Sequence, residues 1–175
     1  MAMERGGNRR RRPQDAKDDR SDGLEEVVIR IYRCSKVVKG GRRFSLAALV
    51  AVGDRAGKVG IGYGKGNETP IAVTKAMSEA RKNLKTISLD GKTIPHPVIG
   101  RCGASKIVMI PASEGTGVIA GKKIRPLLEL AGIHDLLTKA YGSTSPKNLI
   151  KAGMDALMKL RSAELISELR GVSVK

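Results

Sequence analysis

The sequence predicts two small α+β domains in one chain, the first with the order β-β-β-α and the second of α/β type. Three observations favour this fold class. Three apolar stretches with strand patterns follow one another closely, a stretch with helical spacing comes directly after them, and strand and helix patterns then alternate again. We expect a disordered basic arm (residues 1–23), a first domain (24–90), a connector (91–105), a second domain (106–165) and a tail (166–175).

The N-terminal arm is polar and of low complexity. It carries seven basic and five acidic residues and no apolar run, so it has nothing with which to form a core. The run Arg9–Arg12 either touches RNA phosphates or belongs to a solvated mobile arm. No signal peptide or membrane-spanning stretch is apparent, and Cys34 and Cys102 show no CxxC spacing, which indicates a cytoplasmic protein with free thiols.

The first domain begins with three expected strands. In the first strand, apolar Val27, Ile29 and Ile31 alternate with Val28, Arg30 and Tyr32. A loop with two adjacent glycines, Ser35–Arg43, leads to a second strand, Phe44–Val52. A turn at Asp54–Gly57 then precedes a glycine-rich third strand, KVGIGYGKG. Short turns between successive strands predict an antiparallel meander.

A helix is expected after the third strand, because Thr69 suits an N-cap and Pro70 suits the first helical position. The residues that share one face by helical spacing are Val73, Ala76, Met77, Ala80 and Leu84.

The second domain follows a connector that is rich in proline and glycine. Ile107–Ile110 is expected to be a short buried strand, and the glycine-containing loop PASEGTGVIAG leads to a helix that ends at Gly132. Ile133–Tyr141 contains a strand, and Ser145-Pro146 begins a last helix. One face of that helix carries Leu149, Ile150, Gly153, Ala156, Leu157 and Leu160. This alternation predicts an α/β unit.

Charge is the clearest indication of function. Lys and Arg total 33 against 17 Asp and Glu, a formal net charge of +16. A polyanion best offsets such an excess, so nucleic acid is the first candidate partner and an anionic membrane the second. Only four aromatic residues are present, Tyr32, Phe44, Tyr63 and Tyr141, too few for a platform that stacks single-stranded bases. Recognition of folded RNA by backbone and shape fits better.

The stretch between Glu26 and Asp54 contains no acidic residue. Gly40 and Gly41 would allow its basic side chains to approach a phosphate backbone closely. The predicted RNA-binding residues of this stretch are Arg33, Lys36, Lys39, Gly40, Gly41, Arg42 and Arg43. The alternative is a solvated basic hairpin, which normally includes carboxylates for solubility.

Two further basic groups are candidates for RNA binding. Lys65, between Gly64 and Gly66, precedes the first helix, where a phosphate site and a tight turn that needs glycine are equally good explanations. The other group, Lys122, Lys123 and Arg125, begins the helix of the second domain.

Enzymatic sites are poorly supported, and no cofactor or metal is expected. Gly121 follows Gly115 by six positions instead of five, and Lys123 stands where a phosphate-binding loop needs Ser or Thr. Lys65 and Asn67 occupy glycine positions of a GxGxxG motif. The two histidines, Cys102 and Glu114 lack catalytic or metal-binding partners at suitable spacing.

Four blocks, SKVVKGGRRFSLAALVAVGD, GKVGIGYGKG, PASEGTGVIAG and KAYGST, resemble in order and spacing the bacterial type of the small-subunit ribosomal protein S-five family. The resemblance runs from about Leu24 to about Leu165, whereas the Arg- and Asp-rich arm departs from the family.

The resemblance implies a first domain like a double-stranded-RNA-binding fold without its first helix. It implies a second domain that is an α/β sandwich with a left-handed β-α-β crossover, although parallel crossovers are nearly always right-handed. Family members bind small-subunit ribosomal RNA near the body–head junction, beside ribosomal proteins S-four and S-eight and the messenger RNA entry region. They influence decoding accuracy, and their loop matching Ser35–Arg43 affects spectinomycin binding.

The residues alone leave two other functions open. One is a free double-stranded-RNA-binding chaperone or regulator, which would have the same charge and fold. The other is a small nucleotide-dependent enzyme, for which the glycine loops are the sole support.

Overall fold

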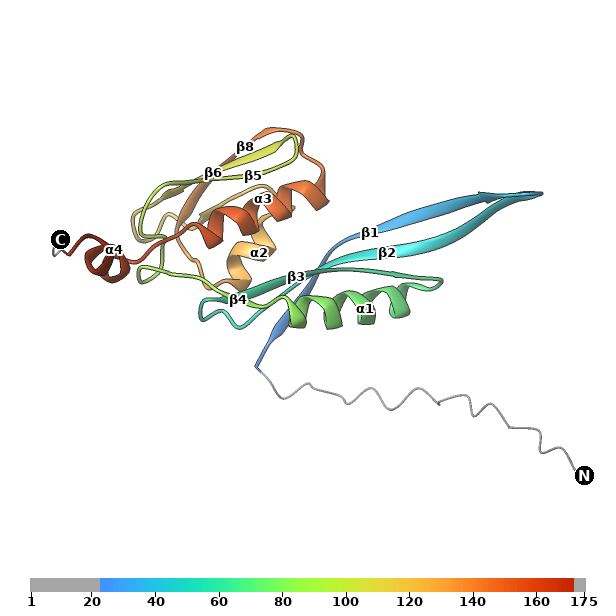
Figure 1. Ribbon diagram of the computed structural model, residues 1–175, viewed down its shortest axis with the longest axis horizontal. Helices are drawn as coiled ribbons and strands as arrows, with labels where there is room; N and C mark the ends of the chain where they lie inside the picture. The colour runs from blue at the N-terminus through green and yellow to red at the C-terminus, as the bar shows by residue number, and fades with distance from the viewer. Residues whose placement is uncertain (1–22, 172–175) are drawn as a thin grey trace, which may run out of the picture.

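A computed structural model describes residues 23–171 and confirms two α+β domains (Figure 1). Within these residues lie two four-stranded sheets and four helices. Most of the predicted arm, residues 1–22, lies outside the described residues, as does the end of the predicted tail, residues 172–175.

The first sheet is an antiparallel meander, as predicted. Its strands are β1 (Glu25–Val38), β2 (Gly41–Gly53), β3 (Lys58–Gly66) and the two-residue β4 (Lys85–Thr86), in the order β1-β2-β3-β4. Helix α1 (Thr69–Lys82) covers one face of this sheet (Figure 1). Glu68 is its N-cap, so the predicted cap at Thr69 was one residue too late.

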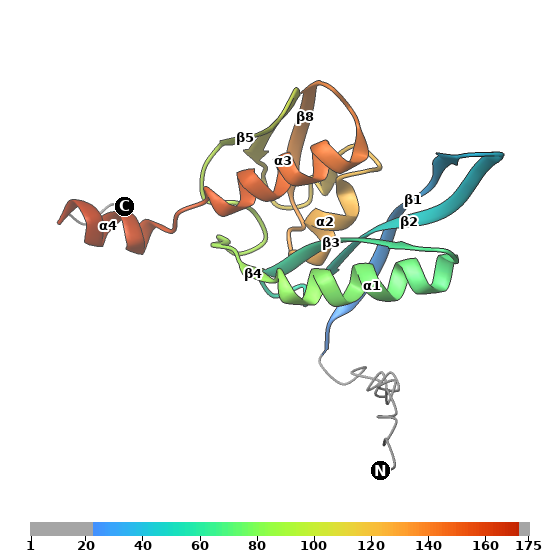
Figure 2. The same cartoon turned by 45° about the vertical axis from the view of Figure 1, so that its right-hand side comes forward.

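The predicted loop Ser35–Arg43 is wrong, because both strands continue through it. Val38 pairs with Gly41, so only Lys39 and Gly40 form the turn, and Gly40 adopts φ 91°. The residues beyond Tyr32 pair continuously because nothing in their sequence interrupts the extended backbone. β1 and β2 therefore form a long hairpin that projects beyond α1 and the second domain (Figures 1 and 2).

A β-bulge changes the predicted alternation of β1. The register shifts between Val28 and Arg30, so that Ile29 is the extra residue. Beyond an extra residue every side chain moves to the opposite face. Tyr32 consequently packs against the core together with Val27 and Ile29, whereas Ile31 is exposed.

Helix α1 lies unusually close to β3, because glycine faces alanine at the contact. A Cβ on Gly62 would come within 2.0 Å of the Ala76 carbonyl oxygen, and one on Gly64 within 2.2 Å of the Ala72 oxygen. Ala72, Ala76 and Ala80 are the fully buried residues of the helix, while the predicted Val73 and Met77 are half-buried at its margin. The glycine repeat of β3 thus allows α1 to approach the sheet closely.

The second sheet has the order β5-β6-β8-β7, and only β7 and β8 are parallel neighbours among its described pairs. Its strands are β5 (Val98–Cys102), β6 (Ser105–Pro111), β7 (Val118–Ile119) and β8 (Leu136–Gly142). Helix α2 (Arg125–Leu130) joins β7 to β8, and the left hand of this crossover stays a prediction. Helix α3 (Pro146–Met158) packs on β5 and β6 with the predicted apolar face buried.

Two predicted boundaries need correction. β5 lies inside the predicted connector 91–105, because the strand is short and its surroundings are rich in proline and glycine, which is typical of a connector. Gly100 instead allows the backbone of α3 to approach, since a Cβ there would lie 2.0 Å from the Ala152 oxygen. Helix α4 (Ala163–Arg170) crosses into the predicted tail 166–175 and projects from the body without a buried residue (Figure 2).

The two domains share one core. Leu49, Ala51 and Val59 of the first sheet belong to the same buried cluster as Leu127 and Leu128 of α2. The first sheet is therefore covered on both faces near its centre, by α1 on one side and by the second domain on the other (Figure 1).

Candidate nucleic-acid interface

The hairpin formed by β1 and β2 has two distinct faces. The face of the first sheet that the second domain covers continues along the hairpin, and we call this side of the hairpin its inner face. The face that α1 covers continues as the outer face of the hairpin. Leu49 lies on the inner side and Ala48 on the outer side, and cross-strand partners share a face. The predicted RNA-binding residues therefore divide: Lys36 and Arg43 lie on the inner face, Arg33 and Arg42 on the outer face.

The outer face is largely apolar. Val37 is 73% exposed, Phe44 54% and Ile31 45%, and all three lie on this face. The guanidinium of Arg33 stacks on the Phe44 ring at 4.0 Å from its centroid. Among the described residues, β1 and β2 expose no large apolar side chain on the inner face.

The inner face is cationic from base to tip. Lys36 and Arg43 are direct cross-strand partners, an arrangement that repels in the free protein. Arg30 pairs with Leu49, and Lys65 of β3 pairs with Ala47, so both also belong to this face. Within residues 23–171 no ion pair engages these four cations.

The carboxylates nearest to the hairpin are engaged at its base. Glu25 binds Arg55 at 2.7 Å, and Glu26 binds Arg81 at 3.1 Å. These pairs lie at the start of β1, at the opposite end from the Lys39–Gly40 turn. The electrostatic potential of the hairpin is consequently set by its cations alone.

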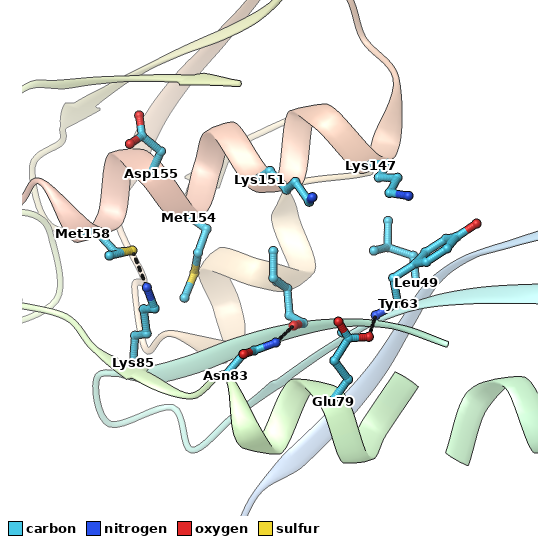
Figure 3. Close-up of a pocket in the computed structure, with 12 residues that line it drawn as sticks. Leu49, Tyr63, Glu79, Asn83, Lys85, Lys147, Lys151, Met154, Asp155 and Met158 are labelled. Atoms are coloured by element: carbon cyan, nitrogen blue, oxygen red, sulfur yellow. Dashed lines mark hydrogen bonds between the residues drawn. The ribbon is translucent and has the colours of Figure 1, made fainter. Parts of the chain in front are cut away.

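Two tyrosines and two cations form a cluster where the hairpin leaves the body. The rings of Tyr32 and Tyr63 are 6.3 Å apart, Arg30 lies over Tyr32, and Lys147 of α3 lies 3.9 Å from the centroid of Tyr63 (Figure 3). Burial and the neighbouring Cys34 raise the pKa of Tyr63, so its hydroxyl stays neutral at physiological pH. The Tyr32 hydroxyl is buried and has no hydrogen-bond partner among the described residues.

The structure explains the two glycines beside Lys65 separately from Lys65 itself. Its flanking glycines are explained by the contact with α1, since a Cβ on Gly66 would lie 2.9 Å from the Ala72 nitrogen. The glycines therefore need no phosphate loop to explain them. Lys65 itself is exposed beside Tyr63 on the inner face and remains a candidate contact.

The third predicted group lies on the second domain. Lys122 and Arg125 are exposed around the start of α2, whereas Lys123 donates a hydrogen bond to the Thr144 carbonyl oxygen and is half-buried. Lys123 thus links the loop before α2 to the loop before α3.

A cleft of about 500 Å³ separates β3 and α1 from α3 (Figure 3). Its acidic residues are already engaged. The Tyr63 N–H donates to Glu79 Oε2 at 2.9 Å, and the Arg101 N–H donates to Asp155 Oδ2 at 2.9 Å. Burial raises the pKa of Asp155, but the hydrogen bonds from Lys159 and Arg101 outweigh it and hold that pKa below its ordinary value.

The described part of the chain shows no arrangement typical of a metal site or a membrane span. No group of three or more His, Cys, Asp or Glu residues is placed to hold a metal ion within residues 23–171. None of the helices in this range is both long and apolar enough to cross a bilayer.

Two members of the inner corner are absent from the residues predicted from the sequence. Arg30 is not among them, because the bulge that fixes its face has no sequence signal. Lys147 comes from another domain, and only the packing of α3 over β3 brings it to Tyr63.

Comparisons with known proteins agree on one family. Residues 24–88 match the family described as ribosomal protein S5, N-terminal domain, and residues 100–170 match ribosomal protein S5, C-terminal domain. The chain is 52% identical over 153 residues to the small ribosomal subunit protein uS5 of Shewanella frigidimarina, covering 87% of this chain and 92% of the relative. It is 51% identical over 159 residues to uS5 of Psychrobacter sp., covering 91% and 96%.

Matches in both domains and relatives about half identical along nearly their whole length lead to one conclusion: the chain belongs to the ribosomal protein S5 (S-five) family.

Proposed function

We propose that this chain is a built-in protein of the small ribosomal subunit in the cytoplasm, where its hairpin binds ribosomal RNA near the junction of body and head. The observation that carries the proposal is the hairpin itself: it projects from the body and holds cations without a single carboxylate between Glu26 and Asp54. A surface of this kind neutralises phosphates and releases counterions. Its work is structural, supporting subunit assembly and translational accuracy.

The candidates for RNA contact are all the site residues predicted from the sequence. On the hairpin and β3 these are Arg33, Lys36, Lys39, Gly40, Gly41, Arg42, Arg43 and Lys65, and on the second domain Lys122, Lys123 and Arg125. Gly40 and Gly41 have no neighbour within 4 Å of an added Cβ, so RNA can approach the tip closely.

Contacts with neighbouring proteins are proposed for the second domain. Helix α4 exposes Leu165 and Leu169, the latter to 68%, and apolar side chains left bare in this way are typical of a protein interface. Ribosomal proteins S-four and S-eight are the proposed neighbours, with the messenger RNA entry region nearby. The spectinomycin site is proposed to lie beside Ser35–Arg43.

The deciding experiment is sedimentation of the tagged chain from cell extract through a sucrose gradient, before and after a high-salt wash. We expect the chain to travel with the small subunit in near one-to-one amount and to survive the wash. A chain that stays at the top of the gradient, yet binds generic duplex RNA in isolation, would be a free chaperone or regulator and would overturn the proposal.

A further inference from the structure

We infer that RNA docks on the inner face of the hairpin, in the corner that this face forms with the start of α3, and that the outer face carries no phosphate contact. The inference rests on the proposed function and specifies which surface of the hairpin performs it. The docked partner is the sugar–phosphate backbone of folded RNA. The corner combines residues of both domains, namely Arg30, Lys36, Arg43 and Lys65 with Lys147 of α3.

The distribution of charge separates the two faces. Five cations line the inner corner and two, Arg33 and Arg42, lie on the outer face of the hairpin. The direct pairing of Lys36 with Arg43 places two like charges side by side, which disfavours the free hairpin and is relieved when a phosphate lies between them. On the outer face, Arg42 pairs with apolar Val37 instead.

The aromatic cluster indicates phosphate rather than base recognition. Arg30 already lies over the Tyr32 ring and Lys147 over the Tyr63 ring, so these cations compete with any base for the ring faces. What the cluster offers a ligand is positive charge held in place by stacking. Tyr63 adds no negative charge, because burial first, and then Cys34, raise its pKa.

Lys147 lies on the second side of the corner, which is the start of α3. Helix α3 begins above Tyr63, and Figure 3 shows the Lys147 side chain directed toward the tyrosine ring. Lys151 lies on the same helix one turn further on, over the cleft, and has no aromatic partner among the described contacts. The two lysines therefore differ in their access to the corner while sharing helix and charge.

The test compares two double variants of the full chain: Lys36→Ala with Arg43→Ala on the inner face, and Arg33→Ala with Arg42→Ala on the outer face. Both remove two charges from the same hairpin. Binding to transcribed small-subunit ribosomal RNA is measured across a salt series, in which each lost phosphate contact lowers the slope of log K against log salt by about 0.7–0.9. We expect the inner pair to lose about 1.4–1.8 units of slope and the outer pair to lose almost none.

A second comparison covers the possibility that a double variant folds poorly. Lys147→Ala is expected to lose about one unit of slope, Lys147→Arg to restore it, and Lys151→Ala to leave it unchanged. Circular dichroism of each variant verifies folding.

The outcomes distinguish this inference from the proposed function. Equal loss in the inner and outer pairs, or a larger loss in the outer pair, would overturn the assignment of the face while leaving the hairpin as the RNA contact. An unchanged Lys147→Ala would remove the second domain from the corner. If no hairpin variant changes binding, the hairpin is no RNA contact, and both proposals fail.

Discussion

Single residues in this protein are often constrained by the backbone of another element. Gly62 and Gly64 leave room for the backbone of α1, and Gly100 leaves room for that of α3. A Cβ on Gly53 would likewise lie 2.3 Å from the Leu130 carbonyl oxygen of α2. The sequence alone indicates that glycine alternates along β3, but it also permits a phosphate loop. The distance to the helix backbone decides between these explanations, and that distance is a property of the folded pair.

Gly62→Ala is expected to destabilise the protein strongly. The new methyl group would meet the Ala76 carbonyl oxygen at 2.0 Å, so α1 must shift away from the sheet. Overpacking of this kind costs about 1–3 kcal/mol or more. Urea unfolding followed by circular dichroism measures the effect. Gly121→Ala is the matched control, because no atom lies within 4 Å of its added Cβ, and an equally large loss there would contradict the explanation.

Asp155 predicts a pH dependence of stability. Burial raises its pKa, but hydrogen bonds from Lys159 Nζ at 2.6 Å and from the Arg101 N–H at 2.9 Å outweigh this and lower it overall. A carboxyl whose folded pKa is depressed stabilises the protein above its ordinary pKa, and this contribution disappears as the pH falls through the folded pKa.

The wild type is therefore expected to be more stable than Asp155→Asn at neutral pH, with a difference that narrows on acidification. Urea midpoints of both proteins between about pH 7 and pH 3 measure it. Lys159→Met removes one of the two donors and is expected to reproduce part of the loss. A difference between wild type and Asp155→Asn that is independent of pH would contradict this role.

At the scale of elements, β1 and its hairpin with β2 show how the sequence pattern and the structure diverge. The period-two pattern predicts a strand at β1 correctly, yet the bulge at Ile29 reverses the faces of every residue beyond it. The hairpin also exceeds its predicted length, because the two glycines suggest a loop, whereas only Lys39 and Gly40 form the turn and Gly41 already pairs with Val38. No local sequence pattern predicts the bulge or the length of the hairpin, since both depend on the register of β1 with β2.

Side chains of α1 and of its C-cap residue, Asn83, close the edge of β3. Glu79 accepts a hydrogen bond from the Tyr63 N–H, and Asn83 Nδ2 donates to the Ile61 carbonyl oxygen at 3.5 Å. β4 pairs only with Lys58 and Val59, so these side chains protect the rest of the edge. Covering an edge in this way prevents pairing between molecules.

Glu79→Ala is expected to cost about 0.5–1.5 kcal/mol of stability and to promote self-association, because it leaves the Tyr63 N–H without its partner. Urea unfolding and sedimentation velocity measure the two effects. Glu79→Gln keeps an acceptor oxygen and is expected to behave like the wild type. Self-association of the Gln variant as well would point to lost charge rather than to an open edge.

At the scale of the whole molecule, two family domains share one hydrophobic core. Sequence patterns predict both domains and most of their elements, but a boundary in the sequence says nothing about whether two units share a core. Leu49 and Val59 lie on the face of the first sheet that α2 covers. The inner corner of the hairpin exists only because this contact brings Lys147 over Tyr63.

Leu128→Ala is expected to destabilise both domains together, by about 2–5 kcal/mol, because it opens a cavity in the shared core. Calorimetry should show one transition at a lower temperature, and hydrogen exchange should show faster exchange in both β2 and β6. Leu137→Ala, on the exposed side of the second sheet, is the control and is expected to be nearly neutral. Faster exchange confined to the second domain would show that the domains unfold independently.

The projecting hairpin also exposes a turn that proteases can reach. Its turn displays Lys39 next to glycine, with Arg42 and Arg43 beside it, and exposed turns of this kind are where proteases cleave first. In the proposed assembly, RNA seated against the hairpin would cover this turn, so free copies are expected to be cleaved there faster than bound ones.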